Sequence, residues 1–325
     1  MRAMSVLERS LHLRQVPLFG SLSDDRLAIF AEEARVRHVK AGEELLREGM
    51  PISAMHVIVD GEITLSRGGA PLQVARRSSS LGVFDALIGR AVVTARAAAP
   101  AVTLEIGIEA LRAILEDNFD VVVHAFEAVG QVVIDRRRAL GPDAGYPEPR
   151  GKVSAGVSPP LALVQRTLML RATLPFGRGS VEALADLARH AREVTFAEGE
   201  RLWAAGAQAD HLIVLAQGGV RAAAPSGQTF RFGPGDTVGF IDCLGAAPRW
   251  YTAAASTPVL GLRVDLEELH DVLEDDFELT LECLGAFATQ AVRLLDDGLR
   301  VAVEEEAPRS LPMPRLPRPP RSNPG

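Results

Sequence analysis

A short stretch in the second half of the chain has the residue types that hold an anion. Residues 239–255 read GFIDCLGAAPRWYTAAA: a glycine, a run typical of one helical turn, and then Arg249 among small residues. Backbone N–H groups at the start of a helical turn and an arginine guanidinium both bind phosphate or carboxylate. Arg249 is therefore either a ligand-binding residue or a surface arginine whose aliphatic stem lies along the indole of Trp250.

The loop belongs to a pattern that occurs twice. Five residue pairs are separated by 157 positions: Phe19 and Phe176, Gly42 and Gly199, Gly49 and Gly206, Gly61 and Gly218, Gly82 and Gly239. Beyond Gly89 the separation becomes 158, which aligns LEDNF at 115–119 with LEDDF at 273–277. Five anchors in one ungapped register indicate an internal duplication.

Each copy is expected to run helix, several short strands, helix. Segments 21–34 and 179–191 predict helices that begin after the N-cap residues Ser23 and Ser180. Apolar runs broken by glycine, such as 55–69 and 211–223, predict short strands with tight turns, and their spacing favours a closed antiparallel barrel or jelly roll. The last helices, within 118–140 and 279–299, carry apolar stripes at helical spacing: Val122, Phe126, Val129 and Val133, and then Leu281, Leu284, Ala288, Ala291 and Leu295.

Composition shifts predict the domain boundaries. Residues 141–160 hold four glycines and five prolines, which no regular element accommodates, and the segment beyond 306 is rich in proline and arginine. We expect an N-terminal helix or arm at 1–15, domain A at 16–140, a linker at 141–160, domain B at 161–303 and a disordered tail at 304–325.

The bulk properties exclude several classes of protein. The net charge is −7, which does not favour nucleic acid as a partner. Cys243 and Cys283 stand in apolar surroundings without metal-type spacing, and no stretch is apolar enough for a membrane span, so we expect a cytoplasmic protein. The histidines form no HxH pair, and the serines and cysteines lack nucleophile motifs, so we expect no metal and no catalysis.

Residues 39–65, VKAGEELLREGMPISAMHVIVDGEITL, resemble the core signature of cyclic-nucleotide-binding domains. The second copy carries a weaker form at 196–223, FAEGERLWAAGAQADHLIVLAQGGVRAA. The resemblance implies a mainly β protein of two eight-stranded jelly rolls, each with flanking helices, as in the tandem arrangement of cyclic-nucleotide-dependent kinase regulatory chains.

The resemblance also implies where a ligand would bind. In this family a cassette similar to F-G-E-L, a helical turn and R-A-A-T binds the cyclic phosphate through backbone N–H groups and the arginine, while the glutamate accepts from a ribose hydroxyl. Domain B keeps the glycine and arginine but has Phe240 in place of the glutamate; domain A has Val83 there, and Ala91 near the arginine position beside Arg90. The candidate ligand-binding residues are Gly239, Phe240, Ile241, Asp242, Arg249, Trp250 and Thr252 in domain B, and Gly82, Val83, Arg90 and Thr94 in the more degenerate domain A.

These departures favour a noncatalytic regulatory or adaptor protein whose two barrels bind another protein, with weak or altered binding of a ligand such as cAMP or cGMP in domain B. One alternative is a genuine cyclic-nucleotide-responsive regulator, and another is a ligand-independent scaffold in which Val83 and Phe240 fill the two bowls. A third is a transcription regulator similar to the catabolite activator, although the tail after Arg300 lacks the helix-turn-helix of such relatives. The stripe on the last helix predicts either a seam within the chain or a homodimer through residues 277–300.

Overall fold

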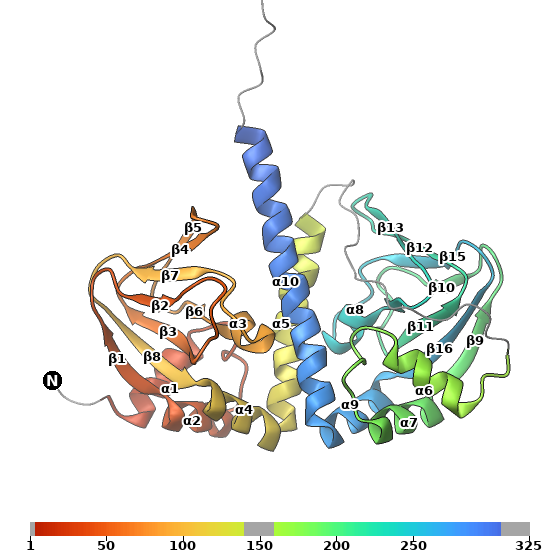
Figure 1. The fold of residues 1–325 in the computed structure, drawn as a ribbon, viewed down its shortest axis with the longest axis horizontal. Helices are drawn as coiled ribbons and strands as arrows, with labels where there is room; N and C mark the ends of the chain where they lie inside the picture. The colour runs from red at the N-terminus through yellow and green to blue at the C-terminus, as the bar shows by residue number, and fades with distance from the viewer. Residues whose placement is uncertain (1–3, 140–158, 307–325) are drawn as a thin grey trace, which may run out of the picture.

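The computed structural model describes residues 4–139 and 159–306, and for 295–306 it describes the backbone alone. Within these residues two barrels lie on opposite sides of a pair of long helices (Figure 1). The predicted linker at 141–160 and tail at 304–325 lie almost wholly outside the described residues, so both remain predictions.

Each barrel is a jelly roll made of two four-stranded antiparallel sheets, as predicted. The strands of the first are β1 Arg35–Val39, β2 Glu44–Leu46, β3 Ala54–Asp60, β4 Ile63–Arg67, β5 Ala70–Ala75, β6 Ser80–Leu81, β7 Thr94–Ala97 and β8 Ala101–Gly107. Those of the second are β9 Arg192–Phe196, β10 Arg201–Trp203, β11 His211–Gln217, β12 Val220–Ala223, β13 Thr229–Phe232, β14 Thr237–Val238, β15 Thr252–Ala255 and β16 Val259–Asp265. The sheet orders are β1-β8-β3-β6 and β2-β7-β4-β5 in the first barrel, and β9-β16-β11-β14 and β10-β15-β12-β13 in the second.

The strand register is the same in both barrels. Met55 on β3 pairs with Ile106 on β8. Their counterparts in the duplication, Leu212 on β11 and Val264 on β16, also pair with each other. The repeat read from the sequence is therefore a repeat of backbone pairing.

Gly61 and Gly218 show why the barrel needs glycine at a duplicated turn. Their φ angles are +92° and +83°. A Cβ on Gly61 would lie 2.6 Å from the Cβ of Ala101, and a Cβ on Gly218 would lie 2.1 Å from the carbonyl oxygen of Pro258. Any other residue would be strained and would clash with the neighbouring strand, so these glycines are required by the fold.

The helices also take equivalent positions in the two copies. They are α1 Val6–Arg14, α2 Asp24–Glu33, α3 Val83–Ile88, α4 Ile108–Asp117 and α5 Phe119–Ala139 in the first, and α6 Leu163–Arg171, α7 Val181–His190, α8 Phe240–Leu244, α9 Leu266–Asp275 and α10 Phe277–Glu306 in the second. The predicted N-caps are confirmed: the hydroxyl of Ser23 accepts from the N–H of Arg26 at 3.3 Å, and that of Ser180 accepts from Ala183 at 3.0 Å.

The long terminal helix of each copy packs against the short helix of the other copy. Figure 1 shows α5 and α10 between the barrels, and the two helices contact each other. A Cβ on Gly130 of α5 would lie 2.7 Å from the Cα of Gly245, directly after α8. In the reciprocal contact, a Cβ on Gly285 of α10 would lie 3.1 Å from the carbonyl oxygen of Leu87 on α3. Each half of the chain therefore supplies a long helix that packs against the short helix of the other half.

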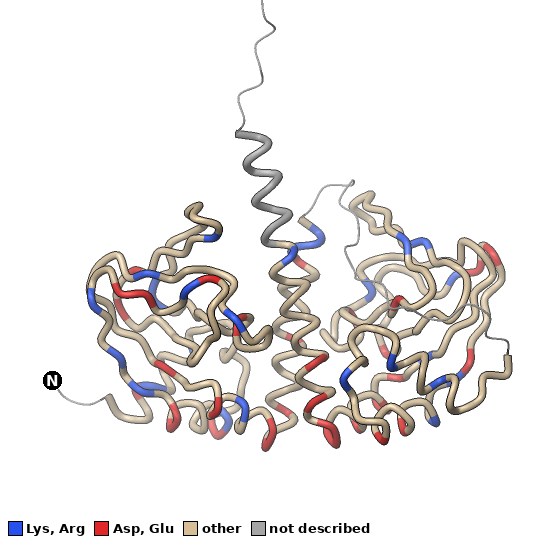
Figure 2. The backbone as a smooth tube through the Cα atoms, in the orientation of Figure 1, with Lys and Arg blue, Asp and Glu red and all other residues tan. Residues whose placement is uncertain are grey.

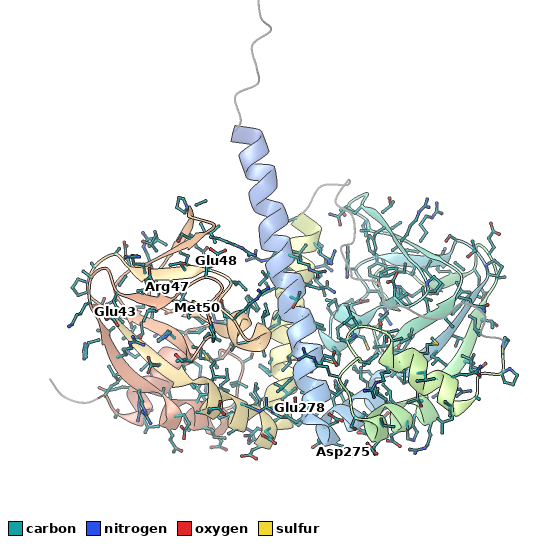
Figure 3. The ribbon with its side chains drawn as sticks, viewed as in Figure 1. Glu43, Arg47, Glu48, Met50, Asp275 and Glu278 are labelled. Atoms are coloured by element: carbon teal, nitrogen blue, oxygen red, sulfur yellow. The ribbon has the colours of Figure 1, made fainter. Side chains whose placement is uncertain are left out.

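Polar contacts add to this junction. Glu278, labelled in Figure 3 at the start of α10, forms an ion pair with Arg112 of α4. Arg112 also lies over the ring of Phe277, 5.1 Å from its centroid. Further along the helix pair, the buried Arg137 of α5 donates to Gln290 of α10 at 2.9 Å.

Most of the apolar stripe residues on α5 and α10 are covered within the chain. All four stripe residues of α5 are buried, as are Leu284, Ala288 and Ala291 on α10, while Leu281 is half-buried and the side chain of Leu295 lies outside the described part of the chain. The ring of Phe126 packs edge-on against Phe287, with 5.4 Å between centroids. The predicted seam is therefore an internal one, and a homodimer through residues 277–300 would have to use a different face of this helix.

The largest buried apolar cluster runs from α1 and α2 through α5 and α10 into the second barrel, while the interior of the first barrel forms a separate, smaller cluster. Across residues 4–139 and 159–306, no helix has the length and apolar character that crossing a bilayer requires.

Candidate ligand site

Arg249 lies inside the second domain rather than on its surface. Its side chain is 0% exposed. Nη1 donates to Oδ2 of Asp242 at 2.9 Å and to the carbonyl oxygen of Gly239 at 3.3 Å, and Nη2 donates to the carbonyl oxygen of His211. The guanidinium carbon lies 4.0 Å from the ring centroid of Trp203. The surface position along Trp250 is therefore wrong, because Trp203 is the indole that the guanidinium covers.

Asp242, the third residue of α8, supplies the counter-charge. It is 1% exposed, and burial raises the pKa of its carboxyl while the charge of Arg249 opposes that shift. A buried ion pair compensates for lost hydration only while both partners remain in place. The guanidinium of Arg249 is therefore held and neutralised by the chain itself.

Aromatic side chains fill the interior of the second barrel next to this pair. They are Trp203, Phe230, Phe232, Trp250 and Tyr251, and all are buried. The ring of Phe230 stacks on that of Trp250 at 5.2 Å, and Tyr251 packs against these two rings at 5.0 and 4.9 Å. This cluster leaves little room for a ligand beside Arg249.

Phe240 does not fill the bowl of the second barrel, contrary to one of the sequence hypotheses. Its ring packs edge-on against Phe287 of α10, with 5.0 Å between centroids, and against Phe176 at 6.4 Å. Because α8 faces the helix pair, the residue after Gly239 points to the junction between the two domains. The residue at the position of the family's glutamate, Phe240, therefore packs against other side chains of the chain.

The other candidates of domain B serve the local backbone and core. Gly239 is the N-cap of α8 with a φ of +84°, and a Cβ there would lie 2.3 Å from Nη1 of Arg249. Ile241 is buried, and the hydroxyl of Thr252 accepts from the N–H of Ala205 at 3.1 Å. The structure thus brings Gly239, Asp242 and Arg249 together. Ligand binding by any of the seven candidates stays a prediction.

In the first domain Ala91, not Arg90, takes the place of Arg249. The backbone of Ala91 forms two hydrogen bonds of 2.8 Å with the turn at 49–50. The backbone of Arg249 forms the equivalent bonds with the turn at 206–207, at 2.7 and 2.9 Å. Arg90, the residue before Ala91, is exposed. The sequence left the choice open because the one-residue length change falls next to these positions.

The remaining domain A candidates repeat the roles of their counterparts. Gly82 is the N-cap of α3 with a φ of +84°, and the hydroxyl of Thr94 accepts from the N–H of Glu48 at 3.1 Å. Asp85 is buried and accepts from the N–H of Val92 at 2.5 Å, and burial raises the pKa of its carboxyl. Sequence reasoning missed Asp85. Its position three residues after Gly82 matches that of Asp242 after Gly239, which is the signal that identifies it.

A cavity of about 760 Å³ opens between the first barrel and helices α3 and α5, and it is lined mainly by aliphatic side chains that include Val83. The aromatic residues of the second barrel correspond in the duplication to Leu46, Gln73, Ala75, Val92 and Val93. Smaller side chains therefore leave open the space that the second domain fills.

No group of three or more His, Cys, Asp or Glu side chains in the described part of the chain could hold a metal ion. Cys243 and Cys283 are unpaired and buried, and burial raises the pKa of both thiols.

Two jelly rolls, each with a helical turn after a left-handed glycine and a long terminal helix, define a tandem protein of the cyclic-nucleotide-binding type. The sequence profile of the cyclic nucleotide-binding domain matches residues 36–118 and 193–276, together just over half of the chain. The chain therefore belongs to the cyclic nucleotide-binding domain family.

Solved structures resemble this chain at low identity. The regulatory domain of Toxoplasma gondii PKA with cAMP is 15% identical, with 92% of this chain and 97% of that chain covered and a TM-score of 0.32. The regulatory subunit of a cAMP-independent protein kinase A from Trypanosoma cruzi, bound to guanosine, is 13% identical over 92% and 89% of the two chains, with a TM-score of 0.33. A cyclic nucleotide-binding-like protein from Brucella abortus is 27% identical over 34% of this chain and 98% of that chain, with a TM-score of 0.31. No curated protein matches the chain.

Proposed function

We propose that this chain is a noncatalytic regulatory protein that acts by binding another protein, and that its second domain does not hold a cyclic nucleotide through Arg249. The observation that carries the proposal is the state of the Arg249 guanidinium. It is fully buried, and both of its terminal nitrogens donate to groups of the chain itself.

A cyclic phosphate would have to take Arg249 away from Asp242. Removing one partner from a buried ion pair costs ~3–5 kcal/mol, which is about two to four decades of affinity. A site of micromolar affinity would fall to roughly the millimolar range. The aromatic cluster adds a steric obstacle to the same event.

The first domain lacks the charge that such a ligand needs. Ala91 stands where Arg249 stands in the second domain, and Val83 stands at the position of the family's glutamate. A cyclic phosphate would be left with backbone N–H groups as its main partners. Both domains therefore favour a protein that has kept the barrels for recognition.

Repeated apolar side chains on the two N-terminal helices support a protein partner. Leu7 and Leu11 on α1 are 70% and 57% exposed, and their counterparts Val164 and Leu168 on α6 are 68% and 60% exposed. Single exposed apolar residues are common, but the same pair at equivalent positions of a duplication indicates a retained surface. We propose that these four side chains contact the partner.

The charge distribution favours a protein partner over nucleic acid. Lys and Arg are spread over both barrels with Asp and Glu among them (Figure 2), and the net charge is −7. Binding of a polyanion is favoured by a concentrated basic surface. A mobility shift of DNA by the full chain at low salt would support the transcription-regulator alternative instead.

Calorimetry with the full chain tests the nucleotide part of the proposal. We expect no saturable heat with cAMP or cGMP up to about 1 mM. A cyclic-nucleotide-responsive regulator would instead show low-micromolar binding that disappears in Arg249→Met, with the fold verified by circular dichroism. That result would overturn the proposal.

Co-purification from the native source tests the protein partner. The full chain, a Leu11→Glu/Leu168→Glu variant and a Glu8→Gln control are compared as baits. We expect a stoichiometric protein that the chain and the control retain and that the double variant loses. Equal recovery of every co-purifying protein by the three baits would argue against this surface.

A further inference from the structure

We propose that the cavity of the first domain binds a small apolar carboxylic acid, with its hydrocarbon body between the barrel and helix α5 and its carboxylate at Arg136 of α5. This site goes beyond the regulatory role proposed above and does not depend on the identity of the protein partner. It also differs in ligand class from the nucleotide that the family name suggests.

The cavity has the size and lining of a ligand pocket. Its volume of about 760 Å³ lies within the ~300–1,000 Å³ usual for small-molecule sites. Strands β2, β4 and β5 contribute Leu46, Leu65 and Leu72, and the loop before β7 contributes Val92 and Val93. An aliphatic ligand body would lose its contact with water there without needing hydrogen-bond partners.

The fold does not require this space to be empty. The second barrel has the same strands and the same register, and it fills the equivalent volume with aromatic rings, including Trp203 in place of Leu46 and Trp250 in place of Val92. Side chains around an unfilled apolar space lose packing contacts. A bound apolar body restores those contacts in the first domain.

The charged groups on the cavity wall select the sign of the ligand. Asp85 accepts from the N–H of Val92 at 2.5 Å. Asp135 accepts from Gln131 at 2.8 Å and lies 3.8 Å from Arg138. Arg136 also lines the cavity at its solvent-exposed edge, and it has no hydrogen bond or ion pair with any described residue. The unpaired group is therefore a cation.

A carboxylate fits this arrangement better than a phosphate ester of a sugar and base. A guanidinium binds one carboxylate through two parallel hydrogen bonds, so a single arginine satisfies it. A sugar and a base carry many polar groups, whereas the polar side chains on this wall besides the charged ones are limited to Gln73, Ser80 and Gln131. Burying those ligand groups without partners would be unfavourable.

The site also touches the other half of the chain. Leu294 of α10 lines the cavity beside Val129 and Val132 of α5. A ligand in the first barrel would therefore contact the terminal helix of the second domain directly. Its binding free energy would stabilise the packing of α5 on α10.

The test is a titration of the full chain with dodecanoate below its micelle concentration, followed by calorimetry, with dodecanol as the uncharged match. We expect saturable binding of one dodecanoate per chain. Arg136→Gln should weaken dodecanoate binding about tenfold or more, because it removes a charge-assisted hydrogen bond, and should leave dodecanol binding unchanged. Arg138→Gln, whose side chain is not on the cavity wall, serves as the matched control.

Two further variants test the location. Val92→Trp and Leu46→Trp each introduce the side chain that the second domain carries at that position, so the barrel has a precedent for both. Each should abolish binding of both probes while circular dichroism stays unchanged. Absence of saturable dodecanoate binding, equal weakening of both probes by Arg136→Gln, or unchanged affinity in the two folded tryptophan variants would each overturn the proposal. None of these outcomes bears on the cyclic-nucleotide titration, so the two proposals fail separately.

Discussion

Separating Asp242 from Arg249 should destabilise the second domain strongly and in a coupled way. Both groups are buried, with 2.9 Å between Oδ2 and Nη1, so Asp242→Ala leaves a cation without its counter-charge and Arg249→Met leaves an anion. Each single change should lower the free energy of unfolding by ~3–5 kcal/mol. The double variant removes both charges and should cost less than the sum of the two, with a coupling of about 2 kcal/mol or more.

Tryptophan fluorescence during urea unfolding reports this domain selectively. The chain's two tryptophans, Trp203 and Trp250, both lie in the aromatic cluster of the second barrel. Asp85→Ala in the first domain removes the equivalent carboxylate, with Ala91 at the position of Arg249, and serves as control; it should leave the fluorescence transition in place. Single-variant losses below about 1 kcal/mol, or strictly additive losses, would refute the buried pair as described.

Two other predictions concern stability. His56 is buried, and burial lowers the pKa of its imidazole to about 4; the unfolded chain binds this proton below about pH 6.5, so stability should fall by roughly 2 kcal/mol between pH 7 and pH 5. His56→Ile, which copies Ile213 of the second domain, should reduce that fall in urea titrations followed by circular dichroism, and an unchanged pH dependence would contradict the assignment. Gly218→Ala should destabilise by about 2 kcal/mol or more, since it adds a clash to the positive φ. Gly199→Ala has the same strain with nothing within 4 Å of the new Cβ and should cost clearly less; equal melting temperatures of the two variants would count against the clash.

Much of the fold could be predicted from the sequence because glycines at left-handed turns constrain the backbone wherever they recur. Gly61 and Gly218 occupy the equivalent turn in the two barrels. Because this turn fixes where the flanking strands begin and end, a constant separation between the glycines predicts the same strand register in both barrels. The N-cap serines and the apolar stripes of the terminal helices could also be predicted from the sequence, because both depend on residues within one element.

The candidate site was less predictable because its state depends on contacts between elements. The sequence pattern of a glycine, a helical turn and an arginine is the same whether the arginine contacts a ligand or a carboxylate of the protein. The answer depends on Asp242 and on Trp203, which comes from strand β10, far from Arg249 in sequence. The cavity of the first domain likewise depends on side-chain volumes contributed by several elements, among them Leu46 on β2 and Val92 in the loop before β7.

The reciprocal seating of α5 and α10 has a consequence for how these barrels pair. Since both halves belong to one polypeptide, their association is an intramolecular event with a fixed effective concentration, independent of how much protein is present. In a dimer of identical subunits every substitution occurs in both copies, whereas the sequences of two fused copies can diverge independently. Here the second barrel is filled with aromatic side chains, whereas the first copy has kept an open cavity beside α5 and α10.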